Sequence, residues 1–257
     1  FYRVDANAPP PPTVVISEIM YHPVEEPVFK KDWSPAINLM EDVHEFIELH
    51  NTSAEPIPLK GWKIAGGVEF AFPDNAVIEP GTFQVVAKNP ERLATIRDYR
   101  LKKGNILGPF MGELSNRGER IRLLDASNQV VETVRYSAAF PWPIGADALG
   151  ASERWTGLDP MDFQYRGLSL ERINFTLPGD DPANWVTSPL ESNPSPGRSN
   201  SVARRQSMPL PVVTRLKAVN AEGDRIIRKT DKVHMEVVFS PTESLSKVPL
   251  EWFMDNI

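Results

Sequence analysis

The chain has 257 residues, no cysteine and a formal net charge of −6 at pH 7. The lack of cysteine excludes a disulfide scaffold, thiolate metal sites and a cysteine nucleophile, although it does not exclude secretion. The acidic balance argues against a general affinity for the nucleic-acid backbone, which requires clustered cations. No run of about 18 apolar residues is present, so the sequence predicts no membrane span.

The first twelve residues resemble neither a signal peptide nor a native terminus. Phe1–Ala6 lacks a basic and an apolar region, and Phe1–Val4 is typical of the last strand of a domain. Ala8–Pro12 is a polyproline segment, which is extended and stiff. We therefore expect residues 1–12 to be the end of a preceding domain and a proline-rich linker, within a longer protein.

Strand signals begin at Thr13. Thr13–Met20 predicts a first strand, and the polar, proline-bearing insertion 23–42 predicts a surface loop. Residues 43–51 then alternate with the period of a strand. This alternation predicts two faces, with Phe46, Glu48 and His50 on one and Ile47 and Leu49 on the other.

A second strand is expected at Leu59–Ile64, with Gly61 at a bulge or tight turn. Its Trp62 is a large apolar side chain. We expect Trp62 to be buried between two sheets, next to Phe46 or Ile47, as the central aromatic residue of the core.

Further along, the pattern alternates between short strands and turns, with one helix. Asn89 as N-cap and Pro90 in the first turn predict a helix over Glu91–Tyr99. The expected strands are Val68–Phe72, Phe83–Ala87 (buried on both faces), a hairpin of Arg120–Leu124 with Val130–Tyr136, and Leu168–Ile173. Pro178–Asn200 is expected to wrap around the domain as a tail held by Trp185.

Six motifs, in this order, resemble the lamin tail domain family in its bacterial, secreted form. They are I-S-E-I at 16–19, E-F-I-E-L-H-N at 45–51, L-K-G-W-K-I at 59–64, Pro80-Gly81 before an apolar strand, the hairpin 114–125, and S-L-E-R at 169–172 with Trp185 and P-S-P-G-R-S-N at 194–200. The resemblance implies an immunoglobulin-like β-sandwich that serves as a non-catalytic module.

We therefore predict an all-β chain with one short helix. The immunoglobulin-like β-sandwich is expected at 13–200 and a linker at 201–211. The N-terminal part of a second immunoglobulin-like β-domain, truncated, is expected at 212–257. Its predicted strands are Val212–Ala218, Lys232–Phe239 and Leu250–Met254.

The most suggestive polar group is acidic. It comprises Glu18, Glu41, Asp42, Glu45 and Glu48, with His22, His44 and His50 close in sequence. If the first two strands are neighbours, Glu18 and Glu48 approach each other, and such a pair needs a proton, a cation or a basic partner when buried. A calcium site, a pair of hydrolytic acids and a structural cluster neutralised by Lys30, Lys31 or Arg172 are the alternatives.

No calcium-loop or hydrolase motif supports the first two alternatives, so we favour a structural cluster and assign no catalytic, cofactor-binding or metal-binding residue. The histidines lack zinc-site spacing, and no serine-hydrolase or phosphate-loop motif is present. Trp33, Trp142 and Trp155 form either a carbohydrate-stacking platform or, as we favour, cover for the ends of the sandwich. The basic pairs 30–31, 102–103 and 204–205 are typical of solvated surface.

The sequence thus predicts a non-catalytic structural or interaction module of a large secreted or cell-surface bacterial protein, with an adhesion, matrix or spacer role. Expected partners are the flanking domains and other surface or matrix proteins or glycans, with no nucleic acid and no cofactor. An alternative is the accessory region of an extracellular hydrolase whose catalytic domain lies elsewhere. DNA or chromatin binding, which eukaryotic members of the family suggest, is disfavoured by the net charge.

Overall fold

The computed structural model describes residues 12–23, 42–101, 105–143, 145–147, 168–188 and 194–202, and the backbone of 212–220 and 233–240. These residues form mostly β-strands, with one short α-helix. The strands belong to two compact units, the larger before residue 206 and the smaller after residue 207.

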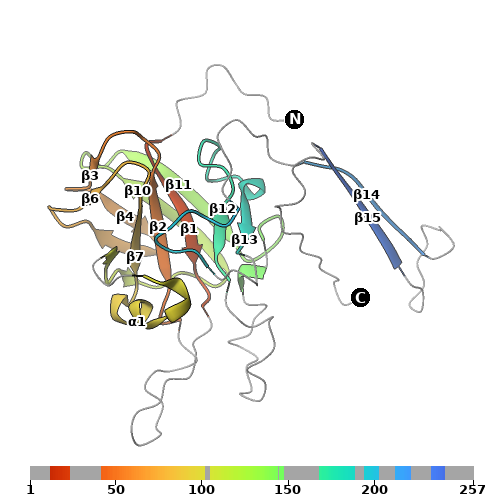
Figure 1. The fold of residues 1–257 in the computed structure, drawn as a ribbon, viewed down its shortest axis with the longest axis horizontal. Coiled ribbons are helices and arrows are strands. Elements are labelled where there is room, and N and C mark those ends of the chain that lie inside the picture. Colours follow the sequence, from red (N-terminus) through yellow and green to blue (C-terminus); the bar gives the residue numbers. More distant parts are fainter. Residues whose placement is uncertain are drawn as a thin grey trace, which may run out of the picture. The chain divides into compact units, whose positions relative to one another are not determined.

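The first sheet of the larger unit has six strands. Their order is β13 (Trp185–Thr187), β12 (Leu170–Arg172), β1 (Val14–Met20), β2 (Phe46–Asn51), β7 (Phe83–Ala87) and β8 (Ile106–Leu107). All neighbours are antiparallel except β7 and β8. β1 and β2 therefore lie in the middle of this sheet, as Figure 1 shows.

The second sheet has five strands. Their order is β11 (Val130–Ser137), β10 (Gly118–Leu124), β4 (Lys63–Gly66), β5 (Val68–Ala71) and β9 (Met111–Gly112). β3 (Ile57–Pro58) and β6 (Val77–Ile78) pair antiparallel in a separate, two-stranded sheet. The expected hairpin is confirmed as β10 and β11, although it starts two residues earlier than predicted.

The main core lies between these two sheets and contains inward-facing side chains of both. Ile47 and Leu49 of β2 and Ile121 and Leu123 of β10 belong to it and are fully buried. The rings of Tyr21, just after β1, and Tyr136, on β11, stack with centroids 4.8 Å apart. The unit is therefore the β-sandwich that the sequence predicted.

A β-bulge interrupts β1 at Ser17. The pairing of β1 with β2 shifts register between Ile16 and Glu18, so that one extra residue stands in β1. An extra residue reverses the faces that follow it. Ile16 and Ile19 accordingly both lie in the main core, whereas Glu18 lies on the outer face of the sheet, opposite Glu48 of β2 in register.

The outer face of the first sheet has a second, smaller apolar cluster. Phe46, Val85 and Ala87 pack there with Met20 and with Leu93 of α1 (Pro90–Thr95). Asn89 caps this helix, as predicted, because its side chain accepts a hydrogen bond from the Arg92 amide. The predicted helix over Glu91–Tyr99 is too long: α1 ends at Thr95, and Arg97–Tyr99 forms a 3-10 turn.

The expectation for Trp62 is wrong. Leu59–Trp62 is a turn closed by a hydrogen bond from the Trp62 amide to the Leu59 carbonyl, and Gly61 has a φ of 76°. The predicted strand Leu59–Ile64 therefore begins only at Lys63. Trp62 is half-buried and packs against the main core. Phe46 lies in the other apolar cluster, on the opposite face of the first sheet.

Two other tryptophans supply the buried aromatic rings instead. Trp185 is 3% exposed, its Nε1 donates to the Gly179 carbonyl, and its ring centroid lies 6.0 Å from that of Trp142. Trp142 is also buried, so it cannot form an exposed stacking platform, and Trp33 and Trp155 lie outside the described residues. Trp185 does hold the tail, which moreover contributes β13 to the first sheet.

The smaller unit consists of β14 (Val212–Asn220) and β15 (Val233–Ser240), which pair antiparallel. These match two of the strands expected for a second β-domain. The third, Leu250–Met254, lies outside the described residues. No helix of the described residues is long and apolar enough to cross a membrane.

The two tryptophans predict different costs of truncation. Trp185→Ala should lower the free energy of unfolding by about 3–5 kcal/mol, the usual cost of removing a buried large aromatic ring. Trp62→Ala should cost clearly less, because its ring is half-buried. Urea unfolding of both variants, with Trp185→Phe as a milder third, checks this; a larger loss for Trp62→Ala would contradict the assignment of the core.

Candidate functional site

Three glutamates from neighbouring strands meet on the outer face of the first sheet. Glu18 of β1 is the register partner both of Glu48 on β2 and of Glu171 on β12. All three side chains are fully buried. The predicted approach of Glu18 and Glu48 is confirmed, and Glu171 is a third member that the sequence analysis missed.

The segment 194–202 covers these carboxylates and supplies most of their hydrogen bonds. Ser195 donates through its amide to Glu18 Oε1 at 3.0 Å, and the Gly197 amide donates to Glu48 Oε2 at 2.5 Å. Ser201 donates through both amide and hydroxyl to Glu171 Oε2. The three carboxylates therefore bind the P-S-P-G-R-S-N segment to the sheet much as side chains cap the free amides of a turn.

Serine hydroxyl groups of β1, of the residue before β12 and of segment 194–202 supply the further hydrogen bonds. Ser17, the bulge residue, donates to Glu48 Oε1 at 2.7 Å, and Ser169 donates to Glu18 Oε1 at 2.5 Å. The Ser195 hydroxyl contacts Glu18 Oε2 at 3.1 Å and Glu171 Oε1 at 2.8 Å. Each of the six carboxylate oxygens thus has a hydrogen-bond partner from the chain.

The contacts of Ser195 favour a protonated carboxyl group in this cluster. A serine hydroxyl has one proton to donate, yet Ser195 Oγ bridges two carboxylates. A protonated carboxyl group on Glu18 or Glu171 would donate the second of these hydrogen bonds to Ser195 Oγ.

Burial accounts for that proton. Burial, and then the charge of Glu171, raises the pKa of Glu18 from 4.5 to about 8. Burial also raises the pKa values of Glu48, well above 4.5, and of Glu171. Near neutral pH the cluster keeps a proton in place of a counter-ion.

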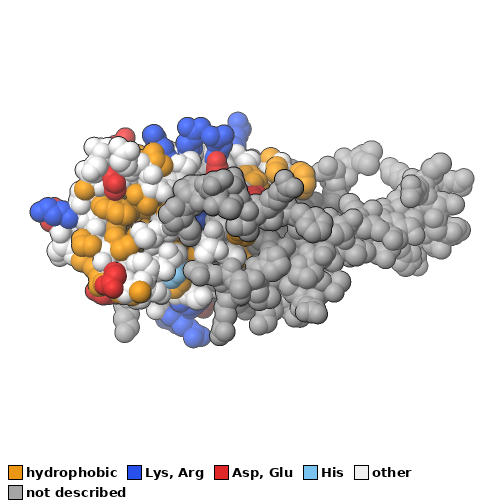
Figure 2. All heavy atoms as spheres, turned by 90° about the horizontal axis from the view of Figure 1, so that it is seen from above, with side chains coloured by type: hydrophobic (Ala, Val, Ile, Leu, Met, Phe, Trp, Pro, Cys, Tyr) orange, Lys and Arg blue, Asp and Glu red, His pale blue; other side chains and the backbone are white. Residues whose placement is uncertain are grey.

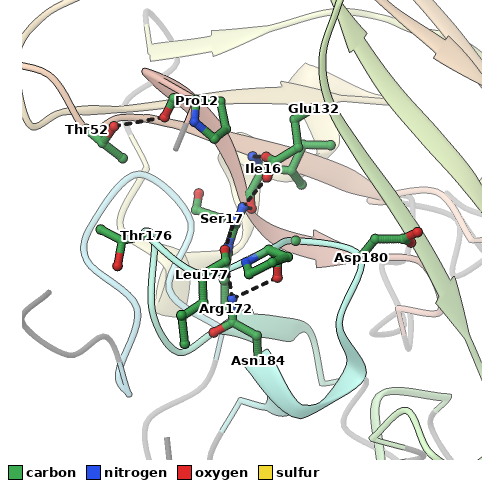
Figure 3. A network of polar contacts seen from close by, with 12 residues as sticks. Pro12, Ile16, Ser17, Thr52, Glu132, Arg172, Thr176, Leu177, Asp180 and Asn184 are labelled. Atoms are coloured by element: carbon green, nitrogen blue, oxygen red, sulfur yellow. Dashed lines mark hydrogen bonds and ion pairs between the residues drawn. The ribbon is translucent and has the colours of Figure 1, made fainter. Parts of the chain in front are cut away.

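Arg172 does not neutralise this cluster, contrary to one of the sequence-based alternatives. It alternates with Glu171 along β12 and faces the main core, where its Nη1 lies 2.7 Å from Glu132 Oε1 of β11 (Figure 3). The same nitrogen donates to the Ile16 carbonyl, Nη2 donates to the Leu177 carbonyl, and Glu132 accepts the Ile16 amide. This buried ion pair connects the two sheets. Lys30 and Lys31 lie outside the described residues.

The other acidic residues singled out in the sequence lie apart from the three glutamates. Asp42 accepts a hydrogen bond from the Asn116 side chain. Glu45 accepts from the Leu114 amide and lies 3.5 Å from Lys88 Nζ, and burial raises its pKa to about 8. Glu41 is outside the described residues. The predicted acidic group therefore divides between two places.

The three histidines also occupy separate positions. His22 Nδ1 lies 2.9 Å from Asp147 Oδ1, and Tyr99 contacts His44. His50 stacks on Phe83 and its Nδ1 contacts the Thr82 carbonyl, and burial lowers its pKa. Among the described residues, no three His, Asp or Glu side chains are arranged to hold a metal ion. The described contacts of these histidines are hydrogen bonds and ring contacts within the fold.

The sequence contained a signal for the missed members of the cluster. Glu171 lies in S-L-E-R and Ser195 in P-S-P-G-R-S-N, two motifs noted for their order alone. Alternation along β12 separates Glu171 from Leu170 and Arg172, which face the core. What could not be read is that segments more than 150 residues apart in sequence meet, as Ser169 and Glu18 do.

Comparison with known protein families gives one match. A family model described as Lamin Tail Domain matches residues 7–138. The match covers β1 to β11, whereas β12, β13 and the segment 194–202 lie beyond it. A search of curated proteins finds no match.

The protonated cluster predicts a pH dependence of stability. Glu18 has a higher pKa in the folded chain than its ordinary 4.5, so its contribution is complete below pH 4.5 and is lost as pH rises through about 8. Glu48 and Glu171 act in the same direction. Glu18→Gln mimics the protonated carboxyl, so it should remove up to about 1.4 kcal/mol per pH unit of this decline.

Thermal melting between pH 5 and pH 9 measures this effect. The wild type should melt at a progressively lower temperature as pH rises, and Glu18→Gln should give a flatter profile. Glu79→Gln, at an exposed position, is the matched control and should follow the wild type. Parallel profiles for wild type and Glu18→Gln would contradict a proton on this cluster.

The hydrogen-bonded cluster also predicts indifference to calcium. A bound ion stabilises a native protein by about 2.7 kcal/mol at a hundredfold excess over its dissociation constant. Because the carboxylate oxygens already accept hydrogen bonds from the chain, we expect equal melting midpoints in chelator and in millimolar calcium. A higher midpoint in calcium that Glu48→Gln abolishes would instead identify a calcium site.

Proposed function

Because this chain belongs to the lamin tail domain family, we propose that it is a non-catalytic structural and interaction module of a large secreted or cell-surface bacterial protein. Members of this family have an immunoglobulin-like, non-catalytic fold. An adhesion, matrix or spacer role follows from such a module when it is one of several in a chain.

One observation carries the non-catalytic part of this proposal. The densest group of perturbed carboxylates, Glu18, Glu48 and Glu171, is fully buried and hydrogen-bonded to the chain. Perturbed pKa values mark active sites only when the groups can reach a substrate. Here segment 194–202 covers them, so they hold this segment rather than act on a ligand.

The multidomain part of the proposal is supported by the smaller unit. β14 and β15 pair with each other in a two-stranded sheet, and such a sheet is marginal in water without further strands. We propose that residues 212–257 begin a second immunoglobulin-like domain after a linker at 201–211. The flanking domains are then the first partners of the sandwich.

The location outside the cell rests on the resemblance of the six sequence motifs to the bacterial, secreted form of the family, and the cysteine-free sequence is compatible with it. Antibodies against residues 13–200 test it. We expect them to bind intact source cells, or to detect the protein in the medium, at a level that permeabilisation does not raise. A cytoplasmic protein serves as the control for cell integrity, and detection only after permeabilisation would refute the location.

A further inference from the structure

Four arginines gather on the outer face of the second sheet. Arg120 and Arg122 lie two residues apart on β10 and so share a face, and Arg135 of β11 is the register partner of Arg120. Arg117 lies in the turn just before β10. All four are exposed.

These arginines line one hollow. Its volume is about 740 Å³, and its lining includes Ser137 and Trp142 as well as the four arginines. Phe140, on the segment between those two residues, is 91% exposed. Figure 2 shows a group of Lys and Arg side chains along one edge of the described surface.

The positive charge of this hollow is only partly offset by the described residues around it. No ion pair involves any of the four guanidinium groups within the described ranges. Glu119 also lines the hollow and contributes a negative charge, but its carboxylate accepts hydrogen bonds from the Ser115 amide and the Tyr136 hydroxyl rather than from a guanidinium group. Asp180 accepts from the main-chain amide of Arg135, not from its guanidinium.

Such an arrangement costs stability in the free protein. Like charges directly opposite each other on neighbouring strands destabilise a sheet, and Arg120 faces Arg135 in this way. The four positive charges also have the opposite sign to the net charge of −6 of the whole chain. A ligand with several negative groups would offset this repulsion, because guanidinium groups bind carboxylate, sulfate and phosphate through paired hydrogen bonds.

The layout of the charges favours an extended ligand of low charge density. From Arg117 to Arg122 they follow β10, and alternate residues on a strand lie roughly 6.6 Å apart. Duplex DNA has one charge per about 1.7 Å, and four cations on an acidic protein match it poorly. An acidic polysaccharide spaces its charges along sugar rings, which can pack against an exposed aromatic ring such as Phe140.

We propose that the outer face of β10 and β11, with Arg117, Arg120, Arg122 and Arg135, binds an acidic polysaccharide. This inference rests on the proposed location outside the cell, where such polymers are the accessible polyanions. The guanidinium groups bind its carboxylate or sulfate groups, and Phe140, exposed on the segment between Ser137 and Trp142, contacts the sugar rings.

Titration calorimetry of the whole chain with a size-defined oligogalacturonate, an acidic oligosaccharide with one carboxylate per sugar, tests this. Arg120→Gln with Arg122→Gln should weaken binding roughly tenfold, since two exposed charge pairs with the ligand are lost. It should also reduce the dependence of binding on salt concentration, because fewer counterions are exchanged. A melting temperature of the variant equal to or above that of the wild type confirms that the fold is intact, because the substitutions also relieve the repulsion between Arg120 and Arg135.

The matched control is Arg97→Gln with Arg100→Gln. It removes the same charge from exposed positions in the turn that follows α1, which packs on the outer face of the first sheet. This variant should leave affinity within about twofold of the wild type. Equal weakening by both double variants would overturn the proposal, because net charge alone would then drive binding. So would absence of binding, or tighter binding of a single-stranded oligothymidylate with equal charge.

The outcomes separate this inference from the proposed function. If antibodies reach the protein on intact cells but the oligosaccharide does not bind, the module remains and this ligand is wrong. If the oligosaccharide binds through Arg120 and Arg122 but the protein is found only inside cells, the location is wrong, and the polysaccharide assignment is overturned with it.

Discussion

The rest of the larger unit depends on one extra residue in its central strand. The bulge at Ser17 lets Ile16 and Ile19 both face the main core while Glu18 faces outward. Without it, the alternation of a regular strand would direct Glu18 into the core with Ile16. The bulge also leaves the main-chain amide and carbonyl of Ile16 to bond with Glu132 and Arg172.

The two buried polar groups on either side of this strand are neutralised in different ways. Inside the sandwich, Glu132 and Arg172 compensate each other, and removing one partner of such a pair typically costs about 3–5 kcal/mol. On the outer face, no cation from the described part of the chain lies among the hydrogen-bond partners of Glu18, Glu48 and Glu171, so a proton has that role. Both groups use side chains to satisfy main-chain groups that the sheet leaves unpaired.

The local sequence pattern predicted some of these features correctly and failed where segments distant in sequence meet. Alternation in residues 43–51 placed Phe46 and Ile47 on the correct faces, because β2 is regular. It could not reveal the bulge, nor that Arg172 reaches Glu132 on the other sheet. Trp62 was misplaced because its apolar character was given more weight than the turn at Gly61, whose positive φ ends the extended conformation before Lys63.

The two outer faces of the sandwich differ in a way that bears on function. On the first sheet, α1 and segment 194–202 cover the outward side chains, including the three glutamates. On the second sheet, Arg120, Arg122 and Arg135 remain exposed. The arginines are scattered from 117 to 135 in sequence, and only the register of the β10–β11 hairpin brings Arg120 opposite Arg135. Among the described residues, the second sheet therefore offers a broad exposed surface to a partner, and its positive charge favours an acidic one.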